Sequence, residues 1–174
     1  MRLHIMHFVP ALLITSGFIL ASAQTRGPDS LVVRLSFSNT YGVDWRTEKR
    51  SPQICFEVSR SGQFRLLRQT DRGNTVVGGD LSDEEMSRLG KKLKDLDLSE
   101  EGRGGLVFRG SESFVVEVLG ARGAMVRSVW IDPDHQQPFP SAVAAVVDWL
   151  QTFRPEGARP VGQSELEEEP ICPR

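Results

Sequence analysis

The chain of 174 residues has only three histidines, and His135 is the only one beyond position 7. Any serine–histidine–aspartate arrangement would therefore need His135, and no serine is marked as its partner. The stretch "GSES" at 110–113 lacks the second glycine of a nucleophile elbow. The stretch "GRGG" at 102–105 is not followed by the Lys-Ser/Thr pair of a phosphate-binding loop. The sequence carries none of these catalytic or nucleotide-binding signatures.

Long apolar runs are also missing, apart from one near the N-terminus. The run Phe8–Leu20 has 13 residues, whereas a membrane-spanning helix needs about 20. Arg2 precedes the run and Ala21-Ser22-Ala23 follows it, which is the order found in a secretory signal peptide. We expect a signal peptide at 1–23, cleaved before Gln24, in preference to an uncleaved membrane anchor. The mature protein is then exported to the periplasm or the extracellular medium and has no integral membrane segment.

The sequence has no large excess of charge of either sign, since 21 basic and 23 acidic residues give a net charge of −2. Nucleic acids and anionic membranes bind basic patches. The short basic groups here, such as "RTEKR" and "GKKLKD", are interrupted by acidic neighbours. The sequence therefore predicts no nucleic-acid partner, and no motif in it indicates a cofactor.

Cysteine is scarce as well, with Cys55 and Cys172 the only two. In an exported chain an even number of cysteines favours a disulfide. We therefore expect a Cys55–Cys172 bond, the alternative being two unrelated thiols. Cys55 alternates with the apolar residues of its predicted strand, so the bond should draw the acidic C-terminal segment across the polar face of the sheet, near Arg65.

The strand predictions rest on apolar and polar residues that alternate along the chain. In "QICFEVS" at 53–59, Ile54, Phe56 and Val58 share one face, as in a half-buried strand. Comparable stretches, rich in β-branched and aromatic residues, occur at 31–38, 63–69, 113–120 and 124–131, with shorter extended pieces at 75–77 and 106–108. Tight turns such as "RSG" and "ARG" connect neighbouring stretches as hairpins.

Two amphipathic helices are predicted. Ser82 and Glu85 have the spacing of a capping box before the first helix, and its apolar stripe follows at helical spacing: Met86, Leu89, Leu93 and Leu96. The acidic run at 83–85 could also indicate a metal site, but helix N-termini favour acidic residues without a metal. The second helix begins near Pro140 and stops before Pro155. Its buried stripe is Val143, Val146, Val147, Leu150 and Phe153.

These elements predict a single α+β domain at 24–155, followed by a Pro/Gly/Glu-rich tail at 156–174. The expected fold is a mostly antiparallel β-sheet of five or six strands, with both helices packed on one face. The other face carries charged residues and is either solvated or a docking surface: Glu57, Arg65, Glu117 and Arg127.

One loop carries residues suited to metal or acid–base chemistry, because Asp132, Asp134 and His135 lie within four positions. Their spacing matches neither a calcium-binding loop nor a pair of histidines on a helix. The loop also joins a predicted strand to a predicted helix, where aspartates commonly form turns. We interpret it as a connector, and keep a metal site at these three residues as the alternative.

The order of elements from Phe56 to Phe153 resembles an uncharacterised family of small exported bacterial proteins that carry a domain of unknown function. The resemblance rests on the hairpin "VSRSGQFRL", the helix "LSDEEMSRLGKKLKDLDL", the strand pair "SFVVEVLGARGAMVRSVWI" and the closing helix "AVAAVVDWLQTF". Members of that family often have an aspartate before the second strand pair, where this chain has "RGSESF". The resemblance implies an exported α+β domain and brings no known activity.

Two functions from different classes remain open. The favoured one is a non-enzymatic exported domain that binds a protein, peptide or envelope component through its open sheet face or an edge strand. The alternative is a metal-dependent hydrolase that uses the loop with Asp132, Asp134 and His135. The absence of catalytic signatures favours the binding domain.

Overall fold

The computed structural model describes residues 31–41, 52–96, 98, 110–133, 135–168 and 171–172. Three predictions lie outside these residues: the signal peptide at 1–23, the extended piece at 106–108, and the position of Asp134. No helix among the described residues has the length and apolar character needed to cross a membrane.

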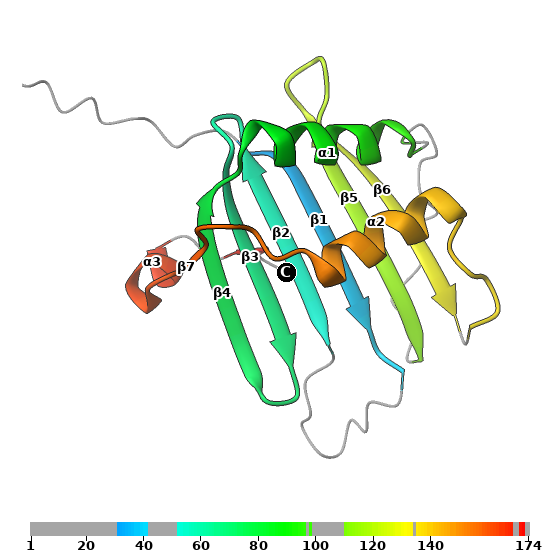
Figure 1. Cartoon of the computed structure of the whole chain (residues 1–174). Coiled ribbons are helices and arrows are strands. Elements are labelled where there is room, and N and C mark those ends of the chain that lie inside the picture. The colour runs from blue at the N-terminus through cyan, green and yellow to red at the C-terminus, as the bar shows by residue number, and fades with distance from the viewer. Residues whose placement is uncertain are drawn as a thin grey trace, which may run out of the picture.

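The fold is α+β, with one antiparallel sheet in the order β6-β5-β1-β2-β3-β4-β7 and two longer helices lying across one face (Figure 1). The strands are β1 (Leu31–Asn39), β2 (Gln53–Ser59), β3 (Gln63–Thr70), β4 (Gly73–Asp80), β5 (Ser111–Leu119), β6 (Met125–Pro133) and β7 (Arg159–Pro160). The helices are α1 (Asp83–Lys94), α2 (Ser141–Thr152) and α3 (Gln163–Glu168).

The period-two alternation of the strands produces the core. In β1, Leu35 pairs with Phe56 on one side and with Val116 on the other, so three apolar side chains meet on the helix face. All three are fully buried. The core contains the buried members of both predicted helix stripes together with the inward-facing strand residues: Leu35, Phe37, Phe56, Val58, Phe64, Leu66, Leu89, Leu96, Phe114, Val116, Val143, Val146, Val147 and Leu150.

The predicted start of the first helix is confirmed. The Ser82 hydroxyl accepts the Glu85 N–H at 3.2 Å, and a Glu85 carboxylate oxygen accepts the Ser82 N–H at 2.8 Å. These two bonds satisfy backbone donors that have no partner inside the helix. Helix α2 has no side-chain cap at Pro140 and no basic residue in its last turn. Its C-terminus is capped instead by a residue of the sheet.

That residue is Arg68, which β3 places on the helix face. Its guanidinium donates to the backbone oxygens of Leu150, Gln151 and Phe153 at 2.8–3.0 Å. Burial, and secondarily the nearby charge of Arg154, lowers the pKa of Arg68 to about 10. Arg68 is therefore protonated at neutral pH, and its charge complements the negative end of the α2 dipole.

The numbers of strands and helices differ from the sequence prediction: the described residues form seven strands and three helices, instead of five or six strands and two helices. Only 75–77 were expected to be extended in this part of the chain, but residues 73–80 form the full strand β4. A Cβ at Gly78 would lie 3.1 Å from the Phe64 oxygen, and one at Gly79 would lie 3.2 Å from the Phe64 ring. Glycine therefore permits close packing against β3 here.

The other additional elements come from the C-terminal segment. After α2, β7 pairs with β4 through Val77–Pro160 and Gly78–Arg159, and α3 follows. Figure 1 shows both elements beside β4, at the sheet edge opposite β6. The segment then reaches the face opposite α1 and α2, which we call the outer face, where Cys172 is bonded to Cys55. It thus passes around the β4 edge from the helix face to the outer face.

Candidate functional site

A row of alternating charges crosses five strands of the outer face. Strand register places Arg34 between Glu57 and Glu117, Glu57 opposite Arg65, and Glu117 opposite Arg127. From β6 to β3 the order is Arg127, Glu117, Arg34, Glu57, Arg65. We call this row the charge ladder. Each charge faces an opposite charge directly across the strand pair, which is the stabilising arrangement for cross-strand pairs.

The centre of the charge ladder is tightly connected. Arg34 donates to Glu57 at 2.9 Å and to Glu117 at 2.8 Å, and Arg65 donates to Glu57 at 2.8 Å. Burial lowers the pKa of Arg34, but its hydrogen bonds with Glu117 and Glu57 raise that pKa above its ordinary value overall. The Glu57 side chain is only 5% exposed. Its charge is therefore compensated by two arginines inside the protein.

The charge ladder loosens toward the β6 edge. Arg127 lies 3.8 Å from Glu117, and its side chain is 62% exposed, against 25% for Arg34. A pair this exposed contributes about 0–1 kcal/mol to stability. The two ends of the charge ladder therefore differ, because Arg65 is held at hydrogen-bond distance and Arg127 is largely open to solvent.

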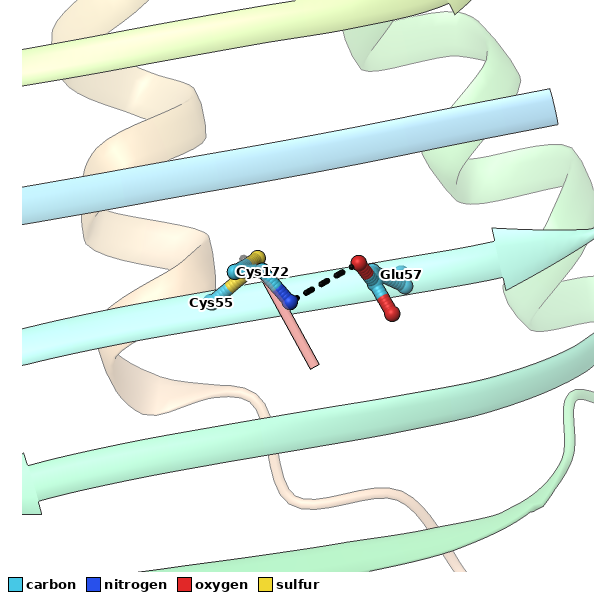
Figure 2. Close-up of side chains that lie close together, drawn as sticks. All are labelled: Cys55, Glu57 and Cys172. Atoms are coloured by element: carbon cyan, nitrogen blue, oxygen red, sulfur yellow. Dashed lines mark hydrogen bonds between the residues drawn. A yellow bond between two sulfur atoms is a disulfide. The ribbon is translucent and has the colours of Figure 1, made fainter. Parts of the chain in front are cut away.

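The predicted disulfide between Cys55 and Cys172 is confirmed. Their Cα atoms are 6.4 Å apart across a sequence separation of 117 residues. The Cys172 N–H donates to Glu57 at 3.1 Å, so the end of the tail is joined both to β2 and to the charge ladder (Figure 2). As predicted, the bond lies on the outer face near Arg65, which pairs with the same glutamate. A disulfide of this kind persists in an oxidising compartment.

This cluster is also where the described residues come closest to a metal site. Ligand atoms of Cys55, Glu57 and Cys172 lie within 4.8 Å of one another. The thiolate is the form of cysteine that ligates metals, whereas here the two sulfurs are bonded to each other. Glu57 is in addition engaged by Arg34 and Arg65. The arrangement therefore acts as a structural junction between the tail and the sheet.

The loop with Asp132 and His135 has a structural arrangement of its own. Asp132 is 6% exposed, and its Oδ1 accepts the Gln137 N–H at 2.9 Å, so it closes a turn. Its Oδ2 lies 4.0 Å from His135 Nδ1. The His135 side chain is 67% exposed and stacks on Tyr41 with 3.7 Å between ring centroids. These contacts are those expected of a connector.

Tyr41 ties this loop to the end of β1. Its hydroxyl donates to the Asp132 backbone oxygen at 2.6 Å and accepts the His135 N–H at 2.6 Å. The His135 backbone has a φ of 54°, in the left-handed region, which non-glycine residues adopt uncommonly. Tyr41 is not among the residues predicted for this loop, and it is 94 residues from His135 in the chain.

Strand β6 forms an edge of the sheet, since among the described residues it pairs only with β5. In the hairpin that joins them, the Gly120 N–H donates to Ala124 at 2.8 Å, while the Gly123 N–H bonds back to Gly120 at 3.0 Å. Gly123 has a φ of 78°, as a bulged three-residue turn requires. Gly120 and Ala124 therefore form the first hydrogen-bonded pair of the β5–β6 hairpin.

The position of this hydrogen-bonded pair determines which backbone groups of β6 point away from β5. Antiparallel pairs alternate between hydrogen-bonded and non-hydrogen-bonded. The pairs Leu119–Met125 and Glu117–Arg127, and those that follow at every second position, are consequently non-hydrogen-bonded. The outward backbone groups belong to Met125, Arg127, Val129 and Ile131. The side chains of these same residues lie on the outer face.

Neither the scan of protein-family models nor the search of curated proteins gives a match for this chain. The resemblance to small exported bacterial proteins therefore stays a prediction.

Four of the five charges in the charge ladder were predicted to lie on this face, and Arg34 was not among them. A signal was present, because Arg34 is the only charged residue in "LVVRLSFS" and alternates with Leu35 and Phe37. The same period of two that places those residues in the core places Arg34 on the opposite face. Its position between two glutamates requires the strand order, which alternation alone does not supply.

Proposed function

We propose that this chain is an exported, non-enzymatic binding domain that takes up an extended segment of a protein or envelope component as an additional strand beside β6. The observation that carries the proposal is the nine-residue edge strand, whose outward backbone groups have no strand partner among the described residues. Such a row of backbone donors and acceptors is a template for pairing with another chain.

The contrast between the two sheet edges supports this choice. Strand β4 is covered in part by β7, whereas β6 carries two exposed apolar side chains, Met125 at 38% and Val126 at 43%. Edge strands that are not used for binding are commonly short, covered or blunted by charges. Strand β6 is long and has one basic residue, Arg127, at its third position.

Export is proposed on two grounds. The first is the order of basic, apolar and small residues at 1–23. The second is the Cys55–Cys172 disulfide, which fits an oxidising compartment. A non-enzymatic role is supported by the arrangement of the polar clusters. The charge ladder compensates its own charges, and Asp132 closes a turn.

Proline substitution tests strand addition directly, because proline removes a backbone N–H and is tolerated on edge strands. The Val129 N–H points away from β5, so Val129→Pro should abolish binding of peptides selected from a random display library. The sheet should remain folded. Val129→Thr keeps the N–H and should weaken binding far less, and Ile131→Pro provides a second blocking variant.

Hydrogen exchange on the bound protein provides the positional readout. Amide exchange at Val129 and Ile131 should slow when a selected peptide binds, since both groups become hydrogen-bonded. Full peptide binding by a folded Val129→Pro protein, or protection confined to another strand, would show that β6 is not the binding edge. Thermal unfolding of both proline variants controls for loss of the fold.

A further inference from the structure

We infer that the segment bound beside β6 carries an acidic residue directly opposite Arg127, with apolar residues two positions away on both sides. This inference rests on the proposed strand addition and specifies its ligand. The order of charges along the charge ladder supports it first. Signs alternate without exception over five strands, and the last position at the open edge is basic. A sixth strand continues this pattern with an acidic residue.

Arg127 itself has hydrogen-bond donors to spare. A guanidinium has five N–H donors in a planar fork. The acidic partner of Arg127 among the described residues is Glu117, at 3.8 Å, and Glu117 is already engaged by Arg34 at 2.8 Å. With its side chain 62% exposed, Arg127 retains donors that can meet a carboxylate arriving from the open side.

Backbone geometry places that carboxylate in register. Arg127 forms a non-hydrogen-bonded pair with Glu117, so its N–H and C=O point outward and bond to the residue opposite it on an added antiparallel strand. Side chains of directly opposed residues lie on the same face of the sheet. The residue aligned by the Arg127 backbone is therefore the one that its guanidinium reaches.

The neighbouring positions determine the rest of the pattern. On the outer face Arg127 is flanked by Met125 and Val129, two residues away on either side. Met125 is 38% exposed. Residues of an added strand opposite these two also share the outer face. Apolar side chains there bury apolar area of β6, so the expected segment reads apolar, any, acidic, any, apolar.

A second copy of the chain fits this edge less well than a segment with an acidic residue does. The β6 residues with outward backbone groups are Met125, Arg127, Val129 and Ile131, none of which is acidic. No register of two antiparallel β6 strands can therefore place an acid opposite Arg127. The acidic Asp132 is on the other face and only 6% exposed. The charge pattern thus favours a partner of different sequence.

A set of matched peptides tests the inference. We consider an extended peptide of alternating valine and threonine whose central valine is replaced by glutamate, glutamine or lysine. Affinities for the disulfide-bonded wild-type chain are measured by fluorescence anisotropy at low salt. The glutamate peptide should bind about fivefold more tightly than the glutamine peptide, the upper range for a cross-strand ion pair. The lysine peptide should bind least.

Charge reversal provides the matched control. In Arg127→Glu the preference should invert, so that the lysine peptide binds most tightly, and Arg127→Gln should remove most of the discrimination. Equal affinities for all three peptides, combined with loss of binding in Val129→Pro, would overturn the acidic preference and leave strand addition standing. Binding that survives in Val129→Pro overturns both. Self-association of the free chain through β6, detected by light scattering and abolished by Val129→Pro, also contradicts the inference.

Discussion

The two faces of the sheet are both linked to the C-terminal part of the chain, but through different chemistry. On the outer face, β2 carries Cys55, which forms a covalent bond with Cys172. On the helix face, the neighbouring strand β3 carries Arg68, which makes hydrogen bonds to the end of α2. The sequence separations are 117 residues for the disulfide and 82–85 for Arg68.

The difference follows from what each C-terminal element can bury. Helix α2 has an apolar stripe that packs on the core, and Arg68 only has to satisfy its last carbonyl groups. The segment containing α3 has no buried residue in that helix, and its described acidic residues are exposed. Apolar burial therefore contributes little to its attachment. A covalent bond attaches such a segment without requiring a core.

The largest effect is expected from removing the covalent link. Closure of a 117-residue loop stabilises the folded state by about 5 kcal/mol in chain-entropy models, and about 2–5 kcal/mol is typical for small secreted domains. Because Cys55 is fully buried, alanine avoids burying a new hydroxyl. Cys55→Ala combined with Cys172→Ala should lower the free energy of unfolding by about 3 kcal/mol, measured by urea denaturation.

Reduction of the wild-type protein is the control for the double variant and should give a similar midpoint. If the variant and the oxidised wild type unfold at the same urea concentration, the tail is held by its other contacts. The comparison of the two faces then fails.

A smaller effect is expected on the helix face. Arg68→Met keeps a long apolar stem but leaves the Leu150 carbonyl oxygen without its guanidinium donor, whereas the Gln151 and Phe153 oxygens keep their bonds from Arg154. We expect a loss of about 2 kcal/mol, within the range for unsatisfied buried groups. Arg154→Met is the matched control, because Arg154 donates to Gln151 and Phe153 from an exposed position. Its removal should cost less than about 0.5 kcal/mol. Equal losses in the two variants would contradict the capping role of Arg68.

The pKa of Arg68 gives this experiment a second readout. The folded-state pKa of about 10 lies below the ordinary pKa of an arginine. The native state therefore releases this proton at a lower pH than the unfolded state does. The contribution of Arg68 to stability should be independent of pH near neutrality and become more favourable as pH rises above about 10. The stability difference between wild type and Arg68→Met should accordingly stay constant between pH 6 and pH 8.

The two links also differ in how far the sequence predicts them. Two cysteines allow only one intramolecular pairing. The disulfide could therefore be predicted from the number of cysteines and from the oxidising compartment that the predicted signal peptide implies. Arg68 could not be found in this way. The alternation of β3 assigns it to the apolar face with Phe64 and Leu66, where an arginine looks unfavourable. Its acceptors are backbone oxygens, which every residue has, so no residue type in the sequence indicates them.

The need for tertiary contacts also explains why the numbers of strands and helices were predicted wrongly. Strands with alternating side chains were found because one face is buried, and α1 was found because its cap and stripe agree. Strand β4 has three glycines and pairs through its backbone, so its pattern is weak. Strand β7 has two residues and exists only because it meets β4. Such elements depend on tertiary contacts that a local pattern does not encode.

The smallest effect is expected in the loop between β6 and α2, which belongs to neither face. His135→Ala removes the ring that stacks on Tyr41 but keeps the backbone N–H that the Tyr41 hydroxyl accepts. Because the ring is largely exposed, the loss should be about 0.5 kcal/mol or less.

Tyr41→Phe keeps a stacking ring and removes the hydroxyl bridge between Asp132 and His135, so it should lose about 1 kcal/mol. Thermal unfolding measures both, together with metal analysis of the purified proteins. A larger loss in His135→Ala than in Tyr41→Phe, or stoichiometric metal present in wild type and absent from His135→Ala, would show that the imidazole is a ligand and that the loop is more than a connector.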